Sequence, residues 1–275
     1  MQLASTEPTG LKLTRLNHDS SWLVELDGTR LLLDPWTDGA AVVGFAAIHT
    51  AKLGRPTLPA STLQDLDGLV LSHPFADHCN AATLRSLSPD LPLYAPPIAA
   101  WLARRYQRFS EVHVLPDTTR GAPPTRVGNV ELAWCRAAPL FDTTHNALVM
   151  RGAVSGTTLA YCPHAFSTGS AVTEAVDRIL GGRRLDVLLA SFTLLDLPWY
   201  LGGIANLGAE AALDLAVHFQ PRFVVPTHDG PKVDSGFIAH VQRLVPFPDV
   251  AGGLEARQVA AGTLPDTVGQ TWTIA

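Results

Sequence analysis

The stretch VLSHPFADHCN, residues 70–80, places two histidines and an aspartate at the end of an apolar run, and two later histidines also follow apolar runs. Imidazole and carboxylate together are the ligands that suit Zn, Fe or Mn. In an α/β scaffold the strand ends present a site at one rim, so these side chains are expected to converge there. A single histidine at such a place is more often an ordinary core or surface residue. The candidate ligands are His73, Asp77, His78, His164 and His228.

The first part of the chain has the pattern of an antiparallel meander. Short strands are predicted over 11–16, 20–26 and 30–34, with Asp27-Gly28 as a two-residue hairpin turn. A glycine- and proline-bearing segment, about 36–64, follows without regular alternation, and is predicted to be a loop or lid insertion with a helical piece around 41–52.

The histidine motif is expected on a loop between a strand and a helix. The apolar run DGLVLS ends directly at His73, and residues 81–88 have helical spacing. The second half of the chain repeats the plan, with strands first and then strand–helix units that include a helix at about 170–180. This two-half organisation predicts one α/β (α+β) domain over 1–275, an αββα sandwich of two mixed sheets flanked by helices.

Composition excludes several classes of protein. The 275 residues are 47% hydrophobic and 16% charged, which suits a large core and excludes a disordered chain. A formal net charge of −5 without a basic run argues against nucleic acid as a partner, so a nuclease is disfavoured. The start has no basic, apolar leader and no run of about 18 apolar residues occurs, so we expect a cytoplasmic protein without a membrane partner.

The three cysteines match no disulfide or zinc-ribbon spacing, and reduced core thiols are expected. Cys79 is interpreted as a packing residue rather than a nucleophile or soft ligand. Alternation places Cys162 on the same strand face as His164, so Cys162 is a weaker candidate for the lining of the site.

The motif HPFADH at 73–78, preceded by LLLDPW and followed by PRFVVPTHDG, resembles the metallo-β-lactamase superfamily, most closely its lactonase and phospholipase-like branch. The resemblance covers roughly residues 11 to 235 and implies the αββα fold. It also implies that His73 is the first histidine of a His-x-His-x-Asp-His signature, that Asp77 and His78 are its Asp-His pair, and that His228 is the last ligand.

The departures from this family pattern are informative. Phe75 stands where the second signature histidine belongs, and Leu140 is the nearest match to a later histidine, because His145 comes too late. His164 occupies the place of a bridging aspartate, and a neutral imidazole serves only one ion. The resemblance thus implies one metal position instead of two. The predicted ligands of this position are Asp77, His78, His164 and His228. The favoured ion is Zn, with Fe or Mn as alternatives.

The predicted function is metal-dependent hydrolysis of a small ester, lactone or phosphodiester by a metal-activated water. Asp77 and His73 are the candidate catalytic groups, His73 as a general base or as an orienting residue. Asp34 is expected to hydrogen-bond the loop that carries the motif, and His18 to reach the mouth of the site or to cap its own turn. The alternative is a non-catalytic ligand- or metal-binding protein that keeps the fold with a degenerate site.

Overall fold

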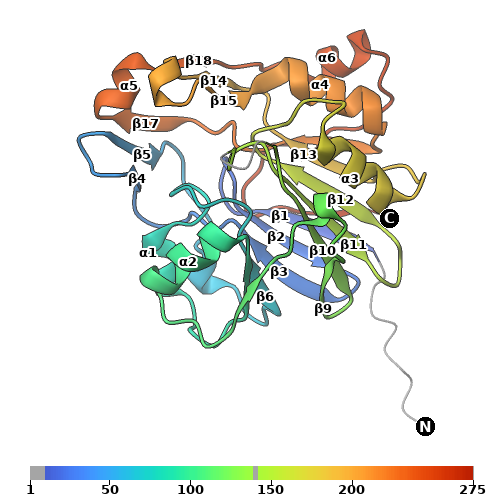
Figure 1. Ribbon diagram of the computed structural model, residues 1–275, viewed down its shortest axis with the longest axis horizontal. Coiled ribbons are helices and arrows are strands. Elements are labelled where there is room, and N and C mark those ends of the chain that lie inside the picture. Colours follow the sequence, from blue (N-terminus) through green and yellow to red (C-terminus); the bar gives the residue numbers. More distant parts are fainter. Residues whose placement is uncertain (1–9, 139–141, 275) are drawn as a thin grey trace.

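Two mixed β-sheets packed face to face form the centre of the computed structural model, which describes residues 10–138 and 142–274 (Figure 1). The first sheet has seven strands in the order β19-β1-β2-β3-β6-β7-β8. Its strands are β1 (Leu11–Arg15), β2 (Trp22–Leu26), β3 (Thr29–Leu33), β6 (Gly68–Val70), β7 (Leu93–Ala95), β8 (Val112–Val114) and β19 (Thr271–Ile274).

The second sheet has six strands in the order β16-β13-β12-β11-β10-β9. The three strands β12, β13 and β16 run parallel, and the others are antiparallel. Its strands are β9 (Thr125–Val127), β10 (Val130–Cys135), β11 (Ala147–Gly152), β12 (Thr158–Cys162), β13 (Val187–Ala190) and β16 (Phe223–Pro226).

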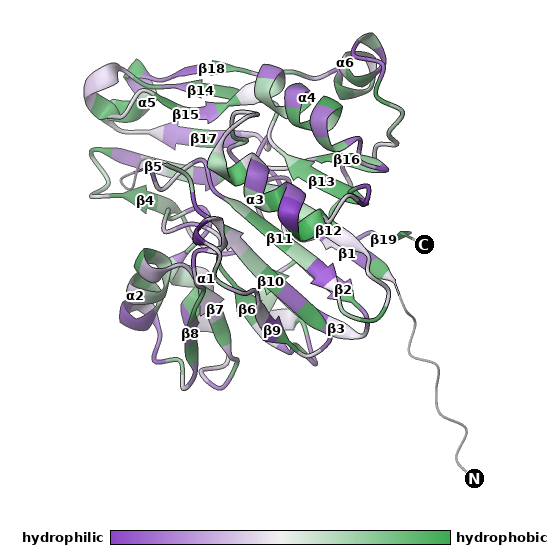
Figure 2. Ribbon diagram, turned by 45° about the vertical axis from the view of Figure 1, so that its right-hand side comes forward, coloured by the Kyte–Doolittle hydropathy of each residue, from purple (hydrophilic) through white to green (hydrophobic). Residues whose placement is uncertain are grey.

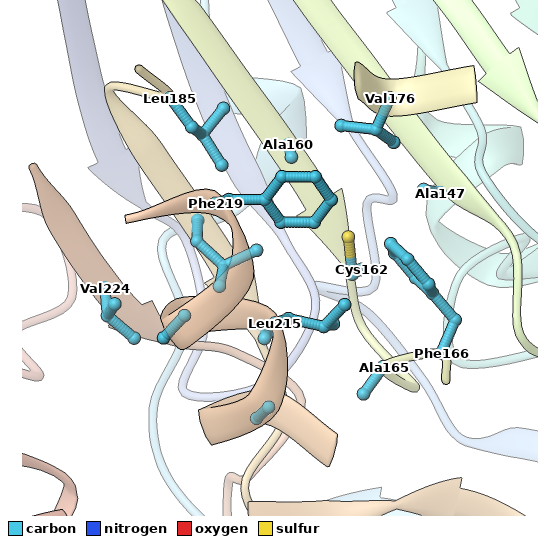
Figure 3. Packing of buried hydrophobic residues seen from close by; sticks show 14 of the residues in the cluster. Ala147, Ala160, Cys162, Ala165, Phe166, Val176, Leu185, Leu215, Phe219 and Val224 are labelled. Carbon is cyan, nitrogen blue, oxygen red and sulfur yellow. The ribbon is translucent and has the colours of Figure 1, made fainter. Parts of the chain in front are cut away.

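Three apolar clusters define four layers. Leu13, Val24, Met150 and Leu189 belong to a cluster between the two sheets, which side chains from both inner faces build. Helices α1 (Ala81–Ser86) and α2 (Pro97–Tyr106) cover the outer face of the first sheet. Helices α3 (Ala171–Leu180), α4 (Gly208–Phe219) and α6 (Val250–Ala256) cover the second. Figure 3 shows Val176 of α3 and Phe219 of α4 in this packing. The predicted αββα sandwich is therefore confirmed.

Local chemistry sets the ends of the elements around the site. Asp27 and Gly28 have φ of 50° and 79°, as a two-residue turn between β2 and β3 requires. Asn80 caps α1, because its side chain accepts hydrogen bonds from the N–H groups of Ala82 and Thr83. The motif therefore lies, as predicted, on a loop between β6 and a capped helix.

The prediction of a helical piece around 41–52 is wrong. That segment forms β4 (Ala41–Val43) and β5 (His49–Leu53), which join β17 (Lys232–Ser235) in a small antiparallel sheet (Figure 2). Pairing with a strand about 180 residues later overrides the local pattern. The remaining elements are β14 (Leu194–Asp196), β15 (Ile204–Leu207), β18 (Arg243–Val245), α5 (Phe237–Val241) and the 3-10 turns Ala60–Thr62, Thr118–Arg120 and Trp199–Leu201.

The three cysteines are free and buried. Cys162 packs among the side chains beneath α3 and α4, including Phe166 and Val176 (Figure 3). The prediction that Cys162 and His164 share a strand face is wrong, because β12 ends at Cys162 and the chain turns before His164. Burial raises the pKa of the Cys79 thiol to about 12, which suits its packing role. Within the described ranges, no helix is long and apolar enough to cross a bilayer.

Candidate metal centre

The candidate ligands come from the carboxyl ends of three strands. His73, Asp77 and His78 follow β6, His164 follows β12 and His228 follows β16. Strands β12 and β16 are both parallel neighbours of β13, which brings their ends to one edge of the second sheet. The parallel pair β3 and β6 brings the motif loop to the corresponding edge of the first sheet.

The side chains meet in one cluster. The ring centroids of His78, His164 and His228 lie 4.8–5.1 Å apart, and that of His73 lies 4.8 Å from His164. The Asp77 carboxylate lies 3.6 Å from Nε2 of His228 and 3.9 Å from Nε2 of His78. The cluster contains two triads, and within each triad the three ligand atoms all lie within 4.8 Å of one another. The triads are His73-His78-His164 and Asp77-His78-His228.

Hydrogen bonding shows which of these atoms are available to a metal. Nε2 of His78 and both ring nitrogens of His164 are buried and have no hydrogen-bond partner. A buried polar atom without a partner is costly, so three of them in one cluster need an explanation. A divalent cation would explain two of them, because it would accept the lone pair of His78 Nε2 and that of one His164 nitrogen, and the residues therefore fit a metal.

Asp34 fixes the orientation of His78. Its buried carboxylate lies 2.7 Å from Nδ1 of His78, and it accepts hydrogen bonds from the backbone N–H of Ser72 at 2.7 Å and from the Ser72 hydroxyl. Burial alone would raise the pKa of Asp34, but His78 and Ser72 outweigh it and lower that pKa. The Nδ1 proton of His78 thus belongs to this contact, which leaves the Nε2 lone pair facing the cluster.

Asp19 holds His228 in the same way. The Asp19 carboxylate is fully buried and lies 3.1 Å from Nδ1 of His228 and 2.8 Å from Nζ of Lys232. Burial would raise the pKa of Asp19, yet these two partners lower it well below its usual range. Burial opposes a charged Lys232 in turn, but Asp19 and Asp77 raise the pKa of its ammonium. Lys232 belongs to β17, so this ion pair joins the small sheet to the centre.

His73 is arranged differently from the other histidines. Its Nε2 donates to the carbonyl of Thr144 at 2.8 Å, and its Nδ1 lies 2.6 Å from the hydroxyl of Ser72. Burial and the neighbouring His78 lower its pKa to about 3, so His73 is neutral near pH 7. A general base needs a free lone pair and a pKa near the working pH. The structure therefore favours the orienting role of His73 over the basic one.

The remaining histidines have other partners. Nδ1 of His18 lies 2.7 Å from the Asp266 carboxylate, and it is the next residue, Asp19, that reaches a ligand. His145 pairs with Asp142 at 2.9 Å. Leu140 lies outside the described residues. Phe75 packs against His73 and His164, with centroids 6.1 and 5.8 Å away, so an apolar ring borders the cluster where the signature has a histidine.

The centre is almost closed to solvent. His73, His78, His164 and His228 are at most 6% exposed, whereas the Asp77 side chain is 24% exposed. Asp77 therefore marks the open side of the cluster. Burial would raise its pKa, but His78 and His228 lower it, so the carboxylate is ionised.

Comparison with known proteins supports this architecture. A sequence model described as "Beta-lactamase superfamily domain" matches residues 29–228, which include every ligand of the cluster. The chain is 33% identical over 92 residues to the N-acyl-phosphatidylethanolamine-hydrolyzing phospholipase D 1 of Caenorhabditis elegans, a match over 32% of this chain and 25% of the relative. The chain thus spans about a quarter of the length of this curated relative.

Two solved structures share the fold at low identity. A "possible metal-dependent hydrolase" from Veillonella parvula superposes with a TM-score of 0.67 at 13% identity, over 97% of this chain and all of the other. An isothiocyanate hydrolase from Delia radicum gut bacteria has a TM-score of 0.65 at 16% identity, over 96% of this chain and all of the other. At these identities the likeness concerns the fold.

Proposed function

The chain belongs to the beta-lactamase superfamily, and from that premise we propose that it is a metal-dependent hydrolase with one divalent ion. The observation that carries the proposal is the convergence of unpartnered nitrogens of His78 and His164 with His228 and the open carboxylate of Asp77. These four residues are the proposed ligands. Three imidazoles and one carboxylate suit Zn best, with Fe or Mn as alternatives.

The shared position of His78 supports the proposal of a mononuclear centre. Both triads need Nε2 of His78, and that nitrogen has one lone pair to give to one ion. The triads are therefore overlapping groups around one ion rather than two sites, and His164, whose ring centroid lies 4.8 Å from that of His228, would complete the ligand set. His73 keeps both nitrogens in hydrogen bonds and Phe75 has no lone pair, which favours the position next to Asp77 and His228.

A bound ion would lower the pKa of a coordinated water to about 7 and polarise a carbonyl or phosphoryl oxygen. Asp34 and Asp19 hold the imidazoles of His78 and His228 with Nε2 toward the cluster. Asp77 is ionised and faces the open side, so the carboxylate oxygen that does not hold the ion would accept the proton of an attacking water. The C–O or P–O bond of the substrate then breaks, and the leaving oxygen takes up a proton.

The proposed substrates are small esters, lactones or phosphodiesters. The nematode relative, by its name, hydrolyses a phospholipid, and the nearly closed centre suits a small reacting group. The net charge of −5 disfavours nucleic acid. Three free, buried cysteines favour the reducing environment of a cytoplasm.

Metal analysis tests the proposal. We expect protein purified without added metal, or reloaded with Zn, Mn or Fe(II), to hold about one equivalent per chain. His164→Ala should lose the ion, whereas His218→Ala, a change at an exposed histidine of α4 that contacts Asp177, should retain it. Less than about 0.1 equivalent after reloading would reject the hydrolase in favour of the non-catalytic binding protein.

A further inference from the structure

The two small sheets lie next to one another at one end of the molecule (Figure 1, Figure 2). One consists of β4, β5 and β17, and the other of β15, β14 and β18. The chain passes from β17 through α5 directly into β18, and Nε2 of Gln242 donates to the Asp234 carboxylate at 3.0 Å, so the two sheets are linked. The segments 41–55, 194–207 and 231–245, which form these sheets and their connections, are called the small-sheet end below.

The small-sheet end carries most of the exposed large apolar side chains. Of the fifteen such side chains among the described residues, ten belong to it. Trp199 and Tyr200, in the 3-10 turn between β14 and β15, are 87% and 57% exposed, and Phe45, after β4, is 64% exposed. Single exposed apolar residues are ordinary, but a concentration of them marks an interaction surface.

One face of the sheet β4-β5-β17 is uncovered. Val233 lies directly opposite Lys52, and the register places Val42 on the same face. Val42 and Val233 are 40% and 63% exposed. Ala41 and Ala51, on the other face, pack against the buried Trp36. The sheet is therefore covered on one side only.

Both small sheets adjoin the ligand cluster. Lys232 of β17 forms the ion pair with Asp19, the residue that holds His228. The backbone N–H of Leu207, at the end of β15, donates to the carbonyl of His164 at 3.2 Å. The small-sheet end is therefore attached to segments that carry two of the proposed ligands.

Charge indicates the kind of surface that this end meets. The chain has a net charge of −5, yet the small-sheet end has four lysines and arginines against two aspartates. Lys52 and Arg243 are exposed and have no ion pair in the part of the chain that the structure describes, whereas Asp196 and Asp234 are partly buried. Two copies joined through this end would bring cations against cations, which disfavours a dimer. Exposed cations among aromatic rings suit the headgroup region of an anionic bilayer, where Trp and Tyr are enriched.

We propose that the small-sheet end docks on the surface of an anionic lipid bilayer. The rings of Trp199, Tyr200 and Phe45 enter the headgroup region, and Lys52 and Arg243 lie against lipid phosphates. A peripheral contact of this kind needs no spanning segment. It therefore departs from the expectation of no membrane partner without requiring the long apolar run whose absence led to that expectation. The contact needs neither the ion nor hydrolysis, so it goes beyond the proposed function.

Co-sedimentation of the purified protein with lipid vesicles tests the docking. We expect binding to vesicles of equimolar phosphatidylcholine and phosphatidylglycerol, weakened by added salt, and much weaker binding to phosphatidylcholine alone. A cation near an anionic surface contributes about fivefold to binding, so Lys52→Gln/Arg243→Gln should lower the partition coefficient about 25-fold. Trp199→Ala should lower it at least about tenfold, because the bilayer no longer removes a large apolar side chain from water.

Matched controls change the same residue types elsewhere. Trp101→Ala removes a tryptophan that is 54% exposed on α2, and Arg85→Gln/Arg108→Gln removes two exposed arginines near α1 and α2. Both should bind vesicles as the wild type does. His164→Ala should also bind them fully although it lacks the ion, which separates the docking from the hydrolase.

Three results would overturn the inference. The first is no binding to the anionic vesicles at low salt. The second is an equal loss of binding in the control variants, because another face would then make the contact. The third is a dimer in analytical ultracentrifugation that Trp199→Ala dissociates, together with no vesicle binding, because a second copy would then cover this end.

Discussion

Asp34→Asn should separate metal affinity from folding. Asp34 has φ of 44°, a left-handed conformation that asparagine also tolerates, so the change adds little backbone strain. The amide oxygen can still accept from the N–H of Ser72, which leaves the amide NH₂ facing Nδ1 of His78. His78 then moves its proton to Nε2 in order to accept from the amide, and the lone pair that faces the cluster is lost.

The magnitude follows from this tautomer change. To bind an ion, His78 in Asp34→Asn must return its proton to Nδ1, where it meets another N–H donor inside a fully buried contact. One buried donor without an acceptor costs about 1–3 kcal/mol, which corresponds to a roughly 5- to 150-fold weaker metal affinity. The protein without metal keeps its hydrogen bonds in the other tautomer, so its unfolding free energy should fall by less.

Competition with a chromophoric zinc chelator measures the affinity, and denaturant unfolding measures the stability of the metal-free protein. Ser72→Ala removes another partner of Asp34 without altering the tautomer of His78, and should cost about 1 kcal/mol of stability with affinity near wild type. Asp65→Asn makes the same chemical change at an exposed aspartate with φ of 53°, and should alter neither quantity. A folded Asp34→Asn protein whose zinc affinity stays within about threefold of wild type would refute the reasoning.

Three further outcomes are expected. Phe75→His should leave the metal content at about one equivalent by elemental analysis, because His78 still has only one lone pair to share; two equivalents would contradict this. Lys232→Met should lower the unfolding free energy by about 1–3 kcal/mol in denaturant and weaken zinc binding, because the buried Asp19 loses its cation, whereas Lys52→Met on the neighbouring exposed strand position should do neither. His73 has a folded pKa of about 3, below its unfolded value, so the unfolded state binds more protons between pH 6.5 and 3. The unfolding free energy of the metal-free protein should therefore decrease as the pH is lowered through that window, by up to about 1.4 kcal/mol per pH unit. His73→Gln should reduce that slope.

The position of the centre could be predicted because the ends of strands can be recognised in the sequence. Each ligand follows an apolar run, and the parallel order of β12, β13 and β16 brings such ends together. The motif loop between a strand and a helix was equally readable, since Asn80 is a standard cap before helical spacing.

Most of the failures concern contacts between residues far apart in the chain. Strand β5 exists because β17 pairs with it, and nothing within 41–53 shows that partner. The alternation argument for Cys162 assumed a strand that continues to His164, but β12 ends first. No local sequence pattern indicates the ion pair of Lys232 with Asp19 or the hydrogen bond from His73 to the carbonyl of Thr144. The one signal available in the sequence was the polar turn between the first two strands, which contains Asp19.

Backbone strain at the centre bears on whether the site is maintained or vestigial. Asp34, Ala165 and His228 have φ of 44°, 55° and 63°, and each follows or adjoins a strand end that supports a candidate ligand. A non-glycine residue held this way costs about 1–3 kcal/mol and persists only where its surroundings demand it. The backbone N–H of His228 is fixed by the carbonyl of Asp19 at 2.9 Å, and a side chain at Gly230 would meet the carbonyl of His18. A fold retained only for its core could relieve this strain with glycine, and would gain stability by filling the cluster with apolar side chains. The chain instead keeps strain, unpartnered imidazoles and buried carboxylates in one place, which is the arrangement expected of a centre that binds an ion.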